Sequence, residues 1–241
     1  MTFGRIAFAI GMIASGSLTV VNRDFYSAWA PAWVPTHDRP AYVCGALMVA
    51  GGVGLLIQRT AALSARVLFG FTLLWLVLMN TPRLFTAPQI ELNWLAWGQI
   101  AVLVAGALTL AATTEAQLRA ARYLLGVALV PIGLSHFFYL TTATGMVPAV
   151  LPFRPAWVIF TGIAHIAAGA AVLVGVYARL AIILEASMIT AFMLLVWVIP
   201  LLAKPGDVGL WVRVVITLAV ASGVWAVSSK MPSPETATSV G

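Results

Sequence analysis

Hydrophobic residues occur along this chain in long runs that are separated by short polar segments. Each run is close to the roughly 20 residues that a helix needs to cross the hydrocarbon core of a bilayer. The runs cover residues 3–21, 40–57, 62–80, 94–112, 120–140, 155–175, 179–202 and 208–227. The pattern predicts an all-α integral membrane protein with eight transmembrane helices.

The runs fall into two copies of one pattern. Shifting the sequence by 117 residues places glycine on glycine and proline on proline along most of its length. The matched pairs include Arg5 and Arg122, Gly16 and Gly133, Pro31 and Pro148, Pro35 and Pro152, Gly45 and Gly162, Gly52 and Gly169, and Trp94 and Trp211. We therefore predict two four-helix repeats, residues 1–117 and 118–230, followed by a disordered tail at 231–241. Because each repeat has an even number of spans, both insert in the same direction, as two parallel-repeat four-helix bundles.

Composition supports a membrane location. Hydrophobic residues make up 62% of the chain and charged residues only 8%, whereas about a quarter of the residues in soluble domains are charged. The net charge of +6 would suggest nucleic acid in a soluble protein, but here the basic residues stand singly at the ends of the runs. Their long side chains can reach lipid headgroups from there. The bilayer is thus the expected partner, and nucleic acid is not.

The charges also bear on orientation. The side that carries the two termini has a slight excess of basic residues, and such residues favour the cytoplasm. We expect a multi-pass protein of the cell (inner) membrane with both termini in the cytoplasm. Four tryptophans near the ends of the runs, Trp94, Trp157, Trp197 and Trp211, are expected to be interface anchors rather than parts of a cofactor site.

The second run of each copy carries a stripe of small residues. Gly45 and Gly52 mark it in the first copy, and Gly162 and Gly169 mark it in the second. Small residues allow membrane helices to approach closely, since packing drives helix association in lipid. We predict that these four glycines lie at helix contacts.

The connection before each of these runs is long and contains two prolines with three residues between them. They are Pro31 and Pro35 in the first copy, and Pro148 and Pro152 in the second. Proline removes a backbone donor and disfavours the helical conformation at the residue before it. These segments are therefore predicted to be interfacial caps over one mouth of the bundle.

The order of these features resembles the DoxX family. The second copy fits best, with the segment TGIAHIAAGAAVLVGVYARLA from Thr161 to Ala181, and the first copy has the similar GALMVAGGVGLLIQRTAAL from Gly45. The resemblance implies a tandem DoxX-like protein. Some members of that family are membrane subunits of a thiosulfate:quinone oxidoreductase or partners in other membrane oxidoreductase complexes.

We accordingly expect a non-catalytic membrane subunit with oxidoreductase partner subunits, in which a cavity between helices binds a quinone or another lipophile. The family often has an acidic residue in the middle of the second helix. This chain has His165 there, and Met48 in the first copy.

Ionisable groups inside hydrocarbon are costly and are therefore candidates for function. His136, His165 and Glu185 lie within the predicted spans of the second copy, and Arg66 lies near the end of a span in the first. We take these four residues as a candidate ligand site or proton path.

Structural roles stay open for each of them. His165 could be a hydrogen-bonded packing residue, and His136 could make an interfacial hydrogen bond. Glu185 could bond to His165, or form an ion pair with Arg66 or Arg179.

Motifs of catalysis and metal binding are missing from the sequence. It contains no HxxxH or ExxH spacing, no GxSxG or GxGxxG motif and no Walker lysine. We predict neither catalytic residues nor a metal site. A small permease or proton-coupled carrier is the alternative function, with a path lined by the polar residues of the second repeat.

Overall fold

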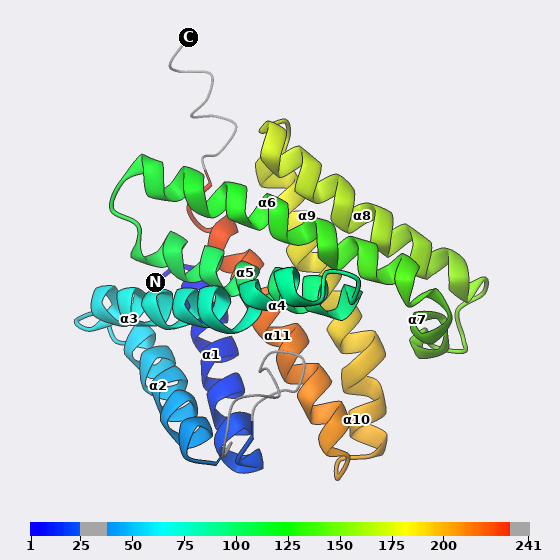
Figure 1. Cartoon of the computed structure of the whole chain (residues 1–241), viewed down its shortest axis with the longest axis horizontal. Coiled ribbons are helices and arrows are strands. Elements are labelled where there is room, and N and C mark those ends of the chain that lie inside the picture. The colour runs from blue at the N-terminus through cyan, green and yellow to red at the C-terminus, as the bar shows by residue number, and fades with distance from the viewer. Residues whose placement is uncertain (25–37, 232–241) are drawn as a thin grey trace.

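The computed structural model describes residues 1–24 and 38–231, and the regular structure in these residues is helical (Figure 1). The elements are α1 (Phe3–Asn22), α2 (Asp38–Leu56), α3 (Ala61–Leu74), η1 (Trp75–Asn80), α4 (Thr81–Thr86), α5 (Glu91–Ala111), α6 (Glu115–Phe138), α7 (Leu140–Met146), α8 (Arg154–Val174), α9 (Ala178–Phe192), η2 (Met193–Val198), α10 (Ile199–Ala203) and α11 (Val208–Ser228). Eight helical segments in these residues are long and apolar enough to cross a bilayer. The chain is an all-helical, multi-pass membrane protein.

Successive spans pack side by side in chain order, and the last packs on the first. The contacts run from α1 through α2, α3, α5, α6, α8 and α9 to α11, which returns to α1. Figure 1 shows two of these pairs plainly, α1 beside α2 and α6 beside α8. In addition α5 and α11 contact each other across the ring, and they are the most buried spans, with 61% and 50% of their apolar windows covered by protein.

Glycines allow the close approach of α1 to α2 and of α6 to α8. A Cβ atom added to Gly45 would lie 2.7 Å from the carbonyl oxygen of Gly16, and one added to Gly133 would lie 2.7 Å from that of Gly162. Gly52 and Gly169 face the backbone of α1 and α6 in the same way. The four glycines of the small-residue stripes therefore lie where neighbouring backbones meet.

Two spans contain a wider helical turn that the hydrophobic pattern does not reveal. The π-helical turns η1 and η2 follow α3 and α9, and each is followed by a proline at the second residue of the next helix, Pro82 or Pro200. Such turns accommodate a residue that cannot donate a backbone hydrogen bond. The third span consequently continues to Thr86, past the predicted end at residue 80.

Parts of the predicted caps and tail fall outside the described residues, namely Pro31, Pro35 and residues 232–241. Pro148 and Pro152 are described and lie in the non-helical connection between α7 and α8. The segment before them contains the helix α7, which has only seven residues and is too short to span a bilayer. Met231, at the start of the predicted tail, packs against the hydrophobic core.

Candidate functional site

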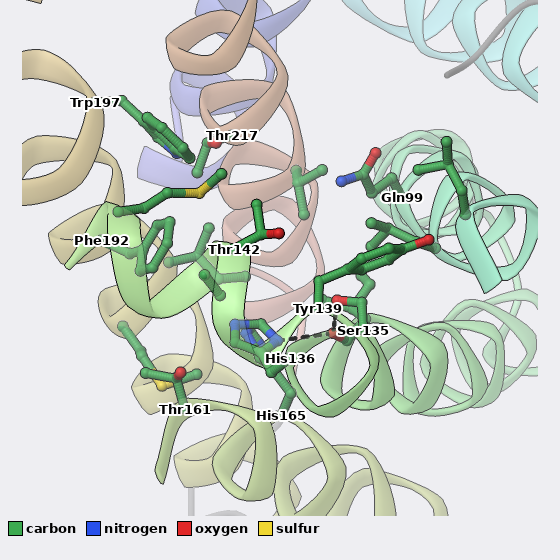
Figure 2. A pocket seen from close by; sticks show the side chains of 18 residues that line it. Gln99, Ser135, His136, Tyr139, Thr142, Thr161, His165, Phe192, Trp197 and Thr217 are labelled. Carbon is green, nitrogen blue, oxygen red and sulfur yellow. Dashed lines mark hydrogen bonds between the residues drawn. The ribbon is translucent and has the colours of Figure 1, made fainter. Parts of the chain in front are cut away.

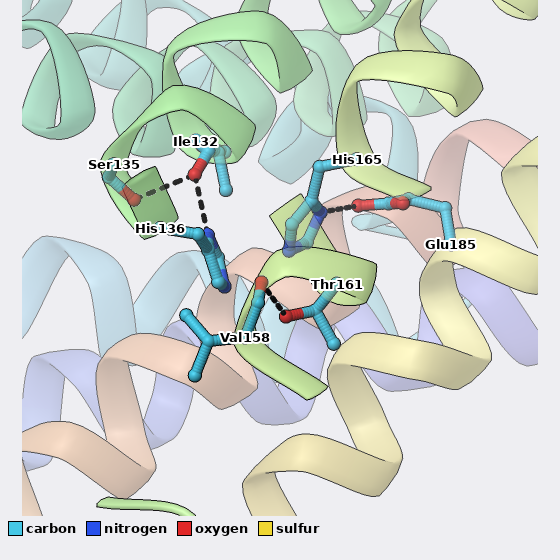
Figure 3. A network of polar contacts seen from close by, with 7 residues as sticks. All are labelled: Ile132, Ser135, His136, Val158, Thr161, His165 and Glu185. Carbon is cyan, nitrogen blue, oxygen red and sulfur yellow. Dashed lines mark hydrogen bonds and ion pairs between the residues drawn. The ribbon is translucent and has the colours of Figure 1, made fainter. Parts of the chain in front are cut away.

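His165 and Glu185 form a buried pair inside the membrane-spanning region. The connection between α8 and α9 is only three residues long and uses left-handed backbone at Gly175 (φ 86°) and Tyr177 (φ 50°), so that the two helices pack antiparallel. This places Nδ1 of His165 2.5 Å from Oε1 of Glu185 (Figure 3). The two residues are 6% and 2% exposed.

The chemistry of the pair determines which imidazole nitrogen of His165 carries the proton. A carboxylate can only accept a hydrogen bond, so Nδ1 of His165 holds the proton when Glu185 is ionised. The second carboxylate oxygen, Oε2, is buried and has no hydrogen-bond partner among the described residues. Glu185 thus orients the ring of His165 and leaves its Nε2 atom for another partner.

His136 places a second imidazole beside the first. Its Nδ1 atom lies 3.0 Å from the carbonyl oxygen of Ile132, to which it donates. The ring centroids of His136 and His165 are 5.0 Å apart, and the rings are inclined by 45°. No hydrogen bond within the described part of the chain engages Nε2 of either ring.

Both imidazoles line a cavity of about 410 Å³, which we call the imidazole cavity (Figure 2). It lies between α5, α6, α7, α8, α9, η2 and α11, toward the membrane side at which α6 ends and α8 begins. The lining residues are Leu92, Leu95, Gln99, Ile132, Ser135, His136, Tyr139, Thr142, Ala143, Met146, Thr161, His165, Met188, Ile189, Phe192, Trp197, Thr217 and Val220. Its volume falls in the range of small-molecule sites, about 300–1,000 Å³.

The cavity wall is largely apolar apart from the imidazoles. Several hydroxyl groups of the wall are already used, because Ser135, Thr161 and Thr217 donate to carbonyl groups of their own helices. The Tyr139 side chain lies at the rim, where burial and the nearby Glu91 carboxylate raise the pKa of its hydroxyl. That hydroxyl therefore stays protonated at physiological pH.

Trp197 is a cavity residue that the sequence pattern misplaced. We expected an interface anchor, but Trp197 is 9% exposed and its ring lines the imidazole cavity. Phe192 packs edge-on against it, and the Arg213 guanidinium lies 5.1 Å from its ring centroid. The π-helical turn η2 contains Trp197, and a local hydrophobic pattern cannot show such a turn.

Three of the four residues of the candidate ligand site or proton path lie together in the structure, and the fourth does not. His136 and His165 face one cavity, and Glu185 supports His165 from behind. Arg66 lies exposed on α3, away from the residues that line this cavity. Among the described residues, the recorded partner of Glu185 is His165 rather than Arg66 or Arg179.

The first half of the chain has apolar or neutral residues at the same three places. Thr19, Met48 and Leu68 stand 117 residues before His136, His165 and Glu185, and all three are buried. The His136, His165 and Glu185 side chains are therefore specific to the second half, although α5 of the first half also lines the cavity. Within the described residues, no cluster of three or more His, Cys, Asp or Glu side chains is placed to hold a metal ion.

Comparison with known families yields one match. A family model described as "Domain of unknown function (DUF8561)" matches residues 125–228, a stretch that includes His136, His165 and Glu185. No curated protein and no solved structure matches the chain.

Proposed function

We propose that this chain is a DoxX-like, non-catalytic membrane subunit that binds a quinone or another lipophile in the imidazole cavity and serves an oxidoreductase partner. The observation that carries the proposal is the pairing of an apolar cavity with two adjacent imidazoles inside the spanning region. Apolar walls with a few convergent polar groups are the usual composition of a small-molecule site.

The geometry suits a ligand with an apolar body and a hydroxyl or carbonyl oxygen. The Leu, Ile, Met and Phe side chains of the wall would contact a ring or an isoprenoid tail. With the proton on Nδ1, Nε2 of His165 or His136 would accept a hydrogen bond from a hydroxyl of the reduced quinol, and it would donate to a quinone carbonyl only when the imidazole is doubly protonated. Trp197 offers an aromatic face for stacking.

Two features support the DoxX-like and tandem-repeat parts of the proposal. Matching hydrogen bonds occur 117 residues apart, with Trp94 Nε1 donating to the carbonyl of Pro88 and Trp211 Nε1 donating to that of Pro205, each at 2.9 Å. The carboxylate that the family often has on its second helix is supplied here by Glu185, from the next helix. We accordingly propose two parallel repeats. The slight excess of basic residues on the side of the termini supports a location in the cell membrane with both termini cytoplasmic.

A direct test titrates the purified protein in detergent with decylubiquinone and measures bound quinone by equilibrium dialysis. The matched variant is His165→Met with Glu185→Leu, which installs the buried pair found at the equivalent places of the first half. We expect saturable binding by the native chain and at least a tenfold loss in the variant. Equal binding by both would overturn the proposed site.

A proton-coupled carrier is the second candidate, because Glu185 and His165 form a buried acid–base pair within the spanning region. In proteoliposomes, a carrier would move protons when a substrate gradient is applied, and the same double variant would stop the flux. A protein that binds quinone but moves no protons fits the first candidate.

A further inference from the structure

A second cavity, of about 400 Å³, lies at the opposite membrane side from the mouth of the imidazole cavity. It is formed where α1 and α3 begin and where α2, α5 and α11 end. The lining residues are Met1, Thr2, Arg5, Leu55, Gln58, Ala61, Ala62, Ala65, Leu110, Ser229 and Lys230. We call it the Arg5 cavity.

Two cationic side chains face the Arg5 cavity, and none of the described residues that line it is acidic. Both Nη atoms of Arg5 lie 3.1 Å from the amide oxygen of Gln58, while its Nε atom is buried without a hydrogen-bond partner among the described residues. Lys230 Nζ donates to the carbonyl of Ala112 at 3.2 Å. The acceptors in these hydrogen bonds are neutral amide and carbonyl oxygens. The contacts therefore do not neutralise the positive charge of Arg5 and Lys230.

Each guanidinium and ammonium group keeps donors that these contacts do not use. Arg5 has five N–H groups and Lys230 has three, and a phosphate offers several acceptor oxygens. The first turn of α3 begins at Ala61, beside the cations, and a helix start adds positive potential. The cavity is therefore electrostatically suited to an anion with several oxygens.

The position of the cavity in the fold indicates the kind of anion. Five helix ends that meet at one membrane side place it at headgroup depth. Its apolar residues lie near the same helix ends: Leu55 and Leu110 stand one residue inside the ends of α2 and α5, and Ala65 stands four residues inside the start of α3. Apolar side chains beside Arg5 and Lys230 match a phosphate group attached to a hydrocarbon chain.

We propose that the Arg5 cavity binds the phosphate of an anionic phosphate ester, either a lipid headgroup or a free phosphate compound, through Arg5 and Lys230. This site is separate from the imidazole cavity and does not depend on the function proposed for it.

The second half of the chain provides a matched control. Arg122 stands 117 residues after Arg5, and its Nε atom is also buried without a partner among the described residues. However, the residue equivalent to Gln58 is Gly175, and the Arg122 guanidinium lies 4.9 Å from the centroid of the Tyr123 ring. A substitution of Arg122 therefore removes one arginine charge and leaves the Arg5 cavity unchanged.

The experiment reconstitutes the full chain in nanodiscs that contain equal amounts of phosphatidylglycerol and phosphatidylcholine, and counts retained lipids by native mass spectrometry. We expect one phosphatidylglycerol retained with about tenfold or greater preference, since each cation near the surface contributes roughly fivefold for an anionic headgroup. Lys230→Gln should reduce the preference, Arg5→Gln with Lys230→Gln should abolish it, and Arg122→Gln should keep it.

Lys230 is exposed at the end of α11, so its single variant keeps the test valid if the Arg5 variant fails to fold. Adding inorganic phosphate distinguishes the two sources of the ligand. Displacement of the lipid by millimolar phosphate would support a free phosphate compound, and resistance would support the lipid. No preference for phosphatidylglycerol together with no phosphate binding would overturn the proposal, as would an equal loss in Arg122→Gln.

Discussion

Glu185 lies inside the membrane-spanning region with one of its two carboxylate oxygens hydrogen-bonded to a single side chain. His165 provides the hydrogen bond recorded for its carboxyl group within the described residues. At the equivalent positions of the first half, Met48 and Leu68 fill buried space without any polar group. The same backbone positions thus accept either a polar pair or an apolar pair, but a mixed pair leaves a buried polar group unpaired.

This dependence predicts the effect of breaking the pair. His165→Leu leaves the Glu185 carboxyl without a partner and should lower the free energy of unfolding by about 3 kcal/mol. His165→Met with Glu185→Leu should recover most of that loss, because no polar group is then left unpaired. Thermal unfolding followed by circular dichroism in detergent measures both. A single variant as stable as the native chain would mean that the pair does not contribute to stability.

His136 allows binding and folding to be separated. Thr19, at the equivalent place, donates to the carbonyl of Ser15 at 2.8 Å, much as His136 donates to that of Ile132. In His136→Thr the new hydroxyl can donate to the same carbonyl oxygen. We therefore expect the free energy of unfolding to change by less than about 0.5 kcal/mol.

Binding of the reduced quinol by His136→Thr should nevertheless weaken by roughly tenfold, which corresponds to the loss of one hydrogen bond. Dialysis against decylubiquinol and a thermal melt of the same sample measure the two effects together. Native affinity in this variant would remove His136 from the site.

At the scale of helices, close packing depends on glycines that face a neighbouring backbone. An added Cβ at Gly45 would contact the Gly16 carbonyl, which cannot move aside without shifting α1. Gly70, by contrast, has open space around its missing side chain. Two glycines of the same half therefore differ in whether a neighbouring backbone leaves room for a side chain.

Gly45→Ala should consequently destabilise the protein by about 1–3 kcal/mol through overpacking. Gly70→Ala should stabilise it by up to about 1 kcal/mol, because alanine has the higher helix propensity. Parallel thermal melts of the two variants test the contrast. If both variants behave alike, the close approach of α1 to α2 is not limited by Gly45.

The helices show what a hydrophobic pattern can and cannot reveal. Runs of apolar residues locate the spans, since burial in lipid requires length and low polarity. The turn η2 escapes this pattern because its residues, MLLVWV, are apolar whether the turn is α-helical or π-helical. Trp197 was therefore expected at an interface, although the structure places it in a cavity wall.

At the scale of the whole molecule, eight spans return the chain to the side where it entered. The connections after α8 and after α10 consequently lie on opposite sides of the membrane. The sequence could predict this alternation, and it could also single out His136, His165 and Glu185 as unusual in hydrocarbon. It could not predict that α5 and α11 meet across the ring or that their side chains complete the cavity, because such contacts join residues that are far apart in the chain.

The orientation that we propose is testable with two exposed positions. In a Cys44→Ala background, Val176→Cys lies on the side of the termini and Gly206→Cys lies on the other. With cytoplasmic termini, a membrane-impermeant maleimide should label Gly206→Cys in intact cells, and Val176→Cys only after permeabilisation. Reversed labelling would place the termini outside. Equal labelling of both would contradict the single span, residues 178–203, that separates the two positions.

We propose that the imidazole cavity holds a lipophile in the native membrane. Native mass spectrometry of the protein, taken from its own membranes in mild detergent, tests this most directly because it records bound small molecules and accompanying chains together. We predict one retained lipophile, of quinone type, on the native chain and none on His165→Met with Glu185→Leu. A bare native chain, or the same molecule retained equally by both proteins, would contradict the account.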